Sequence, residues 1–182
     1  PALARELNGT PLSYLDGPGG TQVPQRVIDA VGDYYSRCNA NTHGAFITSS
    51  ETDQMMIKAR ETMAAFLGAE SGDQVSFGAN MTTLNFALSH ALVRKMSPGD
   101  EIVITDLDHE ANRGPWLNLR ERGIIVKEVR MTAAGTLDRD DLAAKIGERT
   151  RVVAMGMASN ALGTVSLEEI ALARSLSRKV GA

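Results

Sequence analysis

The chain has 182 residues, of which 43% are hydrophobic and 23% charged, and its formal net charge at pH 7 is -3. This composition is typical of a soluble globular protein and argues against disorder or a fibrous repeat. Without a basic run, the charge gives no reason to expect binding to nucleic acid or to an anionic membrane. No apolar stretch approaches the roughly 20 residues that cross a bilayer, and the single Cys38 cannot form an internal disulfide, so we expect a cytoplasmic protein.

Both ends of the sequence suggest that it was cut from a longer chain. The chain starts with Pro1 rather than Met, and its first residues lack the basic and apolar regions of a signal peptide. At the other end, a helical pattern that begins near Ser166 is still running at Val180. We therefore expect this chain to be part of a longer protein.

Two helices are predicted in the first part of the chain. Pro24 can open a helix at its first position, and apolar residues then recur at helical spacing up to Tyr35. A polar, Asn-rich stretch over 38–44 separates this helix from a second helical pattern that carries apolar residues from 55 to 67. Gly68 is placed to cap the end of the second helix.

From residue 73, short apolar runs alternate with helical patterns in the order β-α-β-α-β-α-β. The expected strands and helices in turn cover 74–77, 84–96, 101–105, 116–122, 124–129, 137–146 and 152–157. Buried apolar strands that alternate with amphipathic helices favour a parallel sheet covered on both faces. The sequence therefore predicts an α/β fold, a three-layer α/β/α sandwich with a mainly parallel sheet.

A last helix is expected to begin after Ser166. Ser166 and Glu169 fit a capping box, in which the serine accepts from the third helical N–H and the glutamate reaches back. We divide the chain into an N-terminal helical segment over 1–70 and an α/β domain over 71–182, which we expect to be incomplete at its C-terminus.

Ligands of an open α/β sheet bind beyond the carboxyl ends of its strands, so the residues after each apolar run are the candidate site. After Phe77 comes Gly78-Ala79-Asn80-Met81-Thr82-Thr83, which leads directly into a helix. Free backbone N–H groups at a helix start, the helix dipole and two hydroxyls would suit a phosphate. By local sequence alone, the favoured alternative is that Asn80, Thr82 or Thr83 merely caps the helix.

Two further loops follow predicted strands. The loop after Thr105 carries His109, which can stack on a flat ligand or move protons near neutral pH, but which can equally be a solvated loop residue. The loop after Met157 carries Asn160, whose side chain could donate to a ligand oxygen. The alternative for Asn160 is an ordinary turn, since Asn and Gly are common in turns for backbone reasons.

Several familiar sites are absent from the sequence. The glycines of Tyr14–Pro24 permit close backbone approach but lack the third glycine and the strand-to-helix context of a dinucleotide site. Neither a Gly-Lys-Ser/Thr phosphate loop nor a Gly-x-Ser-x-Gly elbow occurs. With three His and one Cys widely spaced, we expect no Cys/His metal cluster and interpret His43 and His90 as structural residues.

Taken together and in this order, these segments resemble the class V aminotransferases, particularly their cysteine desulfurase and selenocysteine lyase branch. The resemblance runs over nearly the whole chain and includes Tyr14-Leu15-Asp16, Asn39–His43, Ala79–Thr82, His109–Asn112, Pro115-Trp116, Gly135–Asp138 and Ser159–Thr164. It implies a pyridoxal 5′-phosphate (PLP) enzyme of fold type I, of whose large domain this chain is the N-terminal portion.

The resemblance also implies roles for individual residues. Thr82 and the amides around Met81 and Thr82 match the family's phosphate cradle. His109 matches the histidine that stacks on the pyridine ring and can assist proton transfer, and Asn160 matches the asparagine near the cofactor's phenolic oxygen. His109 is accordingly the expected catalytic residue, and all four residues are expected to bind the cofactor.

Other positions depart from the family's pattern. Many desulfurases have Asp-Asn-Ala-Ala-Thr where this chain has Asp16–Thr21, and an acidic residue or histidine often stands where Thr83 lies. These differences point to a divergent subgroup and leave the substrate open. Cys38 does not match the family's sulfur-accepting cysteine, and we give it no catalytic role.

In this family the Schiff-base lysine and the acid that pairs with the pyridinium nitrogen come after the present C-terminus. We therefore expect the intact protein to be a homodimeric PLP-dependent lyase or transferase that removes the Cα proton of a small amino acid. The fragment alone is expected to be inactive. The rival hypotheses are a catalytically inactive fold type I module with a binding or assembly role, and a nucleotide-binding α/β domain, which would lack its Gly-rich signature.

Overall fold

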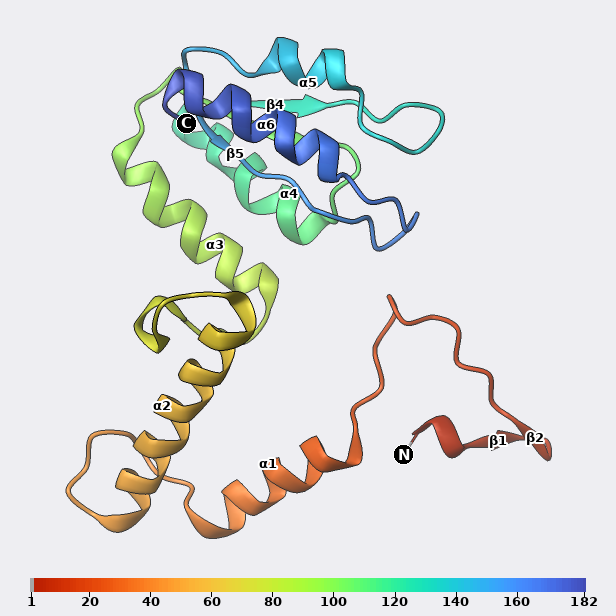
Figure 1. Ribbon diagram of the computed structural model, residues 1–182, viewed down its shortest axis with the longest axis vertical. Coiled ribbons are helices and arrows are strands. Elements are labelled where there is room, and N and C mark those ends of the chain that lie inside the picture. Colours follow the sequence, from red (N-terminus) through yellow and green to blue (C-terminus); the bar gives the residue numbers. More distant parts are fainter. Residues whose placement is uncertain (1) are drawn as a thin grey trace. The chain divides into compact units, whose positions relative to one another are not determined.

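The computed structural model describes residues 2–182. They form two compact units, of which the first extends to Phe77 and the second covers Gly78–Ala182 (Figure 1). From the sequence, we place a domain boundary between residues 70 and 71. That boundary stays a prediction. No helix in this described part of the chain is both long and apolar enough to span a bilayer.

The first unit contains two long helices and a short hairpin. Strands β1 (Glu6–Leu7) and β2 (Thr10–Pro11) pair in antiparallel fashion, and 3₁₀ segments cover Ala2–Ala4 and Gly72–Gln74. Helices α1 (Gln25–Arg37) and α2 (Ile47–Leu67) confirm the two predicted helices.

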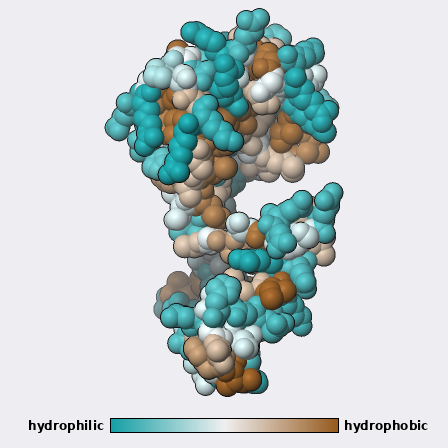
Figure 2. All heavy atoms as spheres, turned by 90° about the vertical axis from the view of Figure 1, so that its left-hand side faces the viewer, coloured by the Kyte–Doolittle hydropathy of each residue, from teal (hydrophilic) through white to brown (hydrophobic). Residues whose placement is uncertain are grey.

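Of the two signals that delimit these helices, Gly68 acts as predicted, whereas Pro24 is the extended residue before α1 and not its first helical residue. Pro24 directly precedes the first residue of α1, and Gly68 ends α2 in the left-handed conformation with φ of 72°, where a Cβ atom would be strained. The apolar residues of α1 recur at helical spacing, but Val27, Ile28 and Val31 stay exposed. Figure 2 shows hydrophobic side chains at the surface of the chain.

The second unit is built on a three-stranded parallel sheet, in agreement with the α/β prediction. Its strands are β3 (Glu101–Thr105), β4 (Ile125–Val129) and β5 (Thr150–Val153), in the order β4-β3-β5. The helices are α3 (Met81–Leu92), α4 (Glu110–Leu117), α5 (Arg139–Lys145) and α6 (Leu167–Val180), with 3₁₀ segments over Val93–Lys95 and Asn118–Arg122.

The central strand β3 is covered on both faces, because successive side chains of a strand point to opposite sides. Ile102 and Ile104 pack with Trp116 of α4 and with Leu119, which follows α4. Val103 packs on the other face, in a cluster with residues of α5 and α6. All five residues of β3 are buried, as is usual for parallel strands between two helical layers. The predicted three-layer α/β/α arrangement is confirmed.

The predictions for residues 74–77 and for the capping box at Ser166 were wrong. Residues 74–77 form no strand: Gly72–Gln74 is a 3₁₀ turn, and Val75 is extended but pairs with no strand of the described chain. A short apolar run becomes a strand only where a neighbour supplies hydrogen-bonding partners. The capping box is not formed either. Ser166 makes no side-chain cap, and Glu169 instead accepts from Nε of Arg139 at 2.8 Å, because a charged donor makes the stronger bond.

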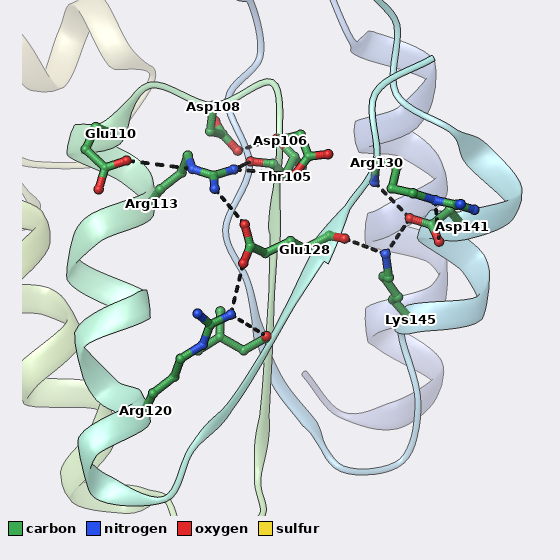
Figure 3. A network of polar contacts seen from close by, with 11 residues as sticks. Thr105, Asp106, Asp108, Glu110, Arg113, Arg120, Glu128, Arg130, Asp141 and Lys145 are labelled. Atoms are coloured by element: carbon green, nitrogen blue, oxygen red, sulfur yellow. Dashed lines mark hydrogen bonds and ion pairs between the residues drawn. The ribbon is translucent and has the colours of Figure 1, made fainter. Parts of the chain in front are cut away.

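A network of ion pairs fixes the carboxyl end of β3 (Figure 3). Arg113 of α4 donates from Nη1 to the carbonyl oxygen of Thr105 at 2.8 Å, and from Nη2 to Oε2 of Glu128 at 2.6 Å. Arg120 donates to Oε1 of Glu128 at 2.9 Å. Since Thr105 is the last residue of β3 and Glu128 lies on β4, the two arginines tie both strands to the helical layer beside them.

This network lowers the pKa of Glu128. Partial burial by itself raises that pKa, but the hydrogen bonds and positive charges of Arg120 and Arg113 together outweigh the effect of burial. A carboxyl whose pKa is lower in the folded state contributes stability that is fully present above its unfolded-state pKa. That contribution is lost as the pH falls through the folded-state pKa.

We expect Glu128→Gln to lower the free energy of unfolding at pH 7 and to have progressively less effect below about pH 4, near the pKa of an unfolded glutamate. The amide preserves shape but removes the charge that Arg113 and Arg120 bind. Urea unfolding of parent and variant at both pH values measures the difference. Glu121→Gln, at an exposed position without an ion pair in residues 2–182, is the matched control. An effect of Glu128→Gln that is the same at both pH values would contradict this account.

The core under α5 and α6 gives a second prediction. Leu142 is 0% exposed, so Leu142→Ala removes apolar contacts and leaves a cavity, which is expected to cost about 2–5 kcal/mol of unfolding free energy. Leu167→Ala, at a residue that is 59% exposed, should change it by less than about 0.5 kcal/mol. Equal losses in the two variants, measured by urea unfolding, would be inconsistent with the core described here.

Candidate functional site

Met81 and Thr82 form the start of helix α3. Asn80 Oδ1 accepts from the N–H of Thr83 at 2.9 Å, so Asn80 caps the helix, as the local sequence favoured. This cap uses one N–H of the first turn. Within residues 2–182 the N–H groups of Met81 and Thr82 have no hydrogen-bond partner, and both residues are exposed. The helix start therefore offers two amides, a hydroxyl and the positive end of its dipole to an anion.

His109 directly precedes helix α4 and caps it. Its Nδ1 accepts from the N–H of Ala111 at 3.0 Å, which explains why α4 begins at Glu110, well before the predicted helix over 116–122. A ring nitrogen that accepts a hydrogen bond carries no proton, so the neutral imidazole carries its proton on Nε2. Because His109 is exposed, its ring and Nε2 are accessible to a ligand.

Asn160 lies in a tight loop that follows β5. Ala158 and Val165 form an isolated antiparallel bridge across the base of this loop, and the N–H of Ser159 donates to the carbonyl of Thr164 at 2.9 Å. These contacts fix the loop backbone, while Asn160 itself is exposed. Its carboxamide is accessible to a ligand oxygen.

Helices α3 and α4 are joined near their first turns by Asn85. Pro115 interrupts the hydrogen bonds of α4, because a proline has no N–H to offer the carbonyl of Ala111 one turn earlier. Asn85 Nδ2 donates to that carbonyl at 3.1 Å and lies 3.3 Å from Asn112 Oδ1. The side chain from α3 thus replaces the bond that proline removes. It holds the first turns of α3 against the turn of α4 that His109 caps.

The loops after β3 and β5 are joined by Asp108. Its carboxylate accepts from Thr105 Oγ1 at 2.6 Å and from the N–H of Gly156 at 2.6 Å. These bonds hold the loop of His109 against the segment that leads to Asn160. The structure therefore gathers the three predicted segments at the edge of the sheet where β3 and β5 end.

Sequence reasoning missed the two side chains that make these connections. Pro115 was an available signal for Asn85, since a proline inside a helix leaves one carbonyl in need of a foreign donor. Asp108 had no comparable signal beyond its place after a strand. Its partner Gly156 lies 48 residues further along the chain.

The sequence of this chain is similar to known desulfurases. The profile of the family described as aminotransferase class-V matches residues 13–182. The cysteine desulfurase of Serratia proteamaculans (strain 568) is 39% identical over 169 residues, which are 91% of this chain and 42% of that protein. The cysteine desulfurase of Enterobacter sp. (strain 638) is 38% identical over 185 residues, which are 99% of this chain and 46% of that protein. The chain thus spans less than half the length of these relatives.

Solved structures share the fold. The apo cysteine desulfurase from Thermococcus onnurineus NA1 matches with a TM-score of 0.83 and 26% identity, covering 93% of this chain and 42% of that one. The cysteine desulfurase CsdA from Escherichia coli matches with a TM-score of 0.77 and 27% identity, covering 92% and 42%. These matches confirm the predicted fold type I architecture. With the profile match over residues 13–182, they lead to the conclusion that this chain belongs to the class V aminotransferase family.

Proposed function

We propose that the intact protein binds PLP and acts as a cysteine desulfurase-like lyase or transferase on a small amino acid. The observation that carries the proposal is the junction of α3 and α4. Asn85 of α3 donates to the carbonyl of Ala111 in the turn that His109 caps, and the amides of Met81 and Thr82 begin α3 without a partner among residues 2–182. The relatives are named cysteine desulfurases, which supports L-cysteine as the substrate to test first.

The donor set at this edge of the sheet fits PLP. A phosphate dianion needs several N–H or O–H donors. The amides of Met81 and Thr82, which have no partner in the described residues 2–182, and the Thr82 hydroxyl supply them. A flat heteroaromatic ring needs a flat partner, which His109 supplies, and a phenolic oxygen needs a donor such as the carboxamide of Asn160. When bound, PLP supplies an electron sink for the charge left after loss of the substrate's Cα proton.

Each residue then has a defined task. Met81 and Thr82 bind and orient the phosphate through the first turn of α3. His109 would cover one face of the ring, and its Nε2–H can donate to a ligand atom. The ring can take up a proton only at Nδ1, by giving up the bond from the N–H of Ala111. Asn160 orients the ring through the phenolic oxygen.

PLP chemistry also requires a lysine that bonds to the cofactor and an acid against the ring nitrogen. Lys127 and Lys145 are engaged in ion pairs, with Glu101 and with Asp141, each at 2.6 Å. We assign the cofactor lysine and the acid to the part of the protein outside this chain, and expect the 182 residues alone to be inactive. A homodimeric, cytoplasmic enzyme that binds neither nucleic acid nor membrane belongs to the same proposal, and light scattering of the full-length protein tests the dimer.

Cofactor binding is the direct test. Full-length protein mixed with PLP is expected to show a visible absorption band that borohydride abolishes. Thr82→Ala should weaken PLP binding by on the order of 10-fold, because it removes one hydrogen bond to a charged group. Thr62→Ala, an exposed threonine on α2, is the matched control and should bind PLP as the parent does. A colourless full-length protein that ignores added PLP would favour the catalytically inactive module instead.

Two substitutions separate the role of the His109 ring from its role as a helix cap. His109→Asn keeps a side chain that caps helices well but removes the imidazole, whereas His109→Ala removes both and should also cost about 1 kcal/mol of stability. Both variants are expected to lose turnover of L-cysteine by on the order of 100-fold or more, as for a general acid or base. Full activity of His109→Asn in a steady-state assay would exclude a role for the ring.

A further inference from the structure

The carboxylate of Asp108 forms two short hydrogen bonds that the proposed chemistry does not use. Oδ2 accepts from Thr105 Oγ1 at 2.6 Å, and Oδ1 accepts from the N–H of Gly156 at 2.6 Å. Thr105 is 2% exposed, so this side of the carboxylate is anchored in the core at the end of β3. Figure 3 shows Asp108 beside Thr105 at this strand end. Bonds to a carboxylate are roughly twice as strong as those between neutral groups.

Gly156 is what allows the backbone to reach this carboxylate. A Cβ atom on residue 156 would lie 2.7 Å from Asp108 Oδ1, a distance that real Cβ atoms do not show. A larger residue at 156 therefore has to displace the carboxylate or the backbone. The contact between Asp108 and Gly156 consequently depends on both residues.

The two residues belong to the two loops of the candidate site. Asp108 directly precedes His109, whose Nδ1 caps α4, and Gly156 precedes the bridged loop that carries Asn160. They are 48 positions apart in the sequence, and the pairing of β3 with β5 brings their strand ends together as far as the bond from the N–H of Ala154 to the carbonyl of Val103. Beyond that bond, the carboxylate of Asp108 joins the two loops.

We propose that Asp108 is a positioning residue: by binding Thr105 and Gly156, it holds the imidazole of His109 in register with the Asn160 loop. Its effect on turnover rests on the proposed function, because PLP has to be bound between these loops for their relative placement to affect catalysis. Its effect on the placement of His109 does not depend on PLP.

The first experiment measures turnover of L-cysteine by the PLP-loaded full-length protein. Asp108→Ala is expected to lower kcat by on the order of 10- to 100-fold with little change in KM, since small misplacements of a catalytic group cost rates of this size. Asp108→Asn should recover most of the loss, because its amide oxygen can accept from Gly156 and its amino group can donate to the Thr105 hydroxyl. Asp106→Ala is the control and should stay active: Asp106 is an exposed acid on the same loop, and its ion pair with Arg113 spans 3.6 Å. Parental kcat in Asp108→Ala overturns the proposal.

The second experiment keeps the proposal separate from PLP binding. In the full-length protein, the imidazole NMR resonance of His109, assigned by its loss in His109→Asn, should shift in Asp108→Ala but not in Asp106→Ala. Gly156→Ala should lower the melting temperature of the parent and leave that of Asp108→Ala unchanged, because the clash needs the carboxylate. An unmoved resonance, or additive effects of the two substitutions, overturns the positioning role. A parent protein that binds no PLP sinks the proposed function alone.

Discussion

Strand β3 lies between β4 and β5 and between two helical layers, so every polar group at its ends has to be satisfied inside the protein. Its first residue, Glu101, is buried. The carboxylate of Glu101 pairs with Nζ of Lys127 at 2.6 Å and with Nη2 of Arg149 at 3.1 Å. Its last residue, Thr105, has its carbonyl bound by Arg113 and its hydroxyl by Asp108. Burying charged and polar groups is costly unless they are paired, and this constraint explains why ion pairs gather at both ends of one apolar strand.

The loops of the candidate site are bonded to the end of β3 that carries Thr105. Three polar side chains make bonds between segments here: Arg113 to β4, Asp108 to the segment after β5, and Asn85 from α3 to α4. Each connects segments that the chain itself does not keep together. These bonds restrict the loops of the site, which is the condition for placing donors around a ligand in advance.

The sequence predicted the elements that depend on neighbouring residues. The parallel sheet and the helices α1 and α2 follow from apolar spacing, and Gly68 follows from the left-handed conformation that ends a helix. The sequence-based predictions failed where an element depends on a residue far away in the sequence. The run over 74–77 lacked a pairing strand among the described residues, and Glu169 bonded to Arg139 in place of a local capping box. The start of α4 was also misplaced, because histidine is seldom considered as a helix cap.

For the candidate site, the sequence by itself determined the residue types and their order: a helix start with Met81 and Thr82, a loop with His109 and a loop with Asn160. It determined these because strand ends and helix starts are local features, and because their order along the chain matches a family. Only the tertiary structure decided which groups remain accessible for binding. The caps by Asn80 and His109 are local bonds, but the bonds of Asn85 and Asp108, which join the loops, connect residues 26 and 48 positions apart. The physical reason is that hydrogen bonds between distant segments form only after the sheet has aligned the ends of its strands.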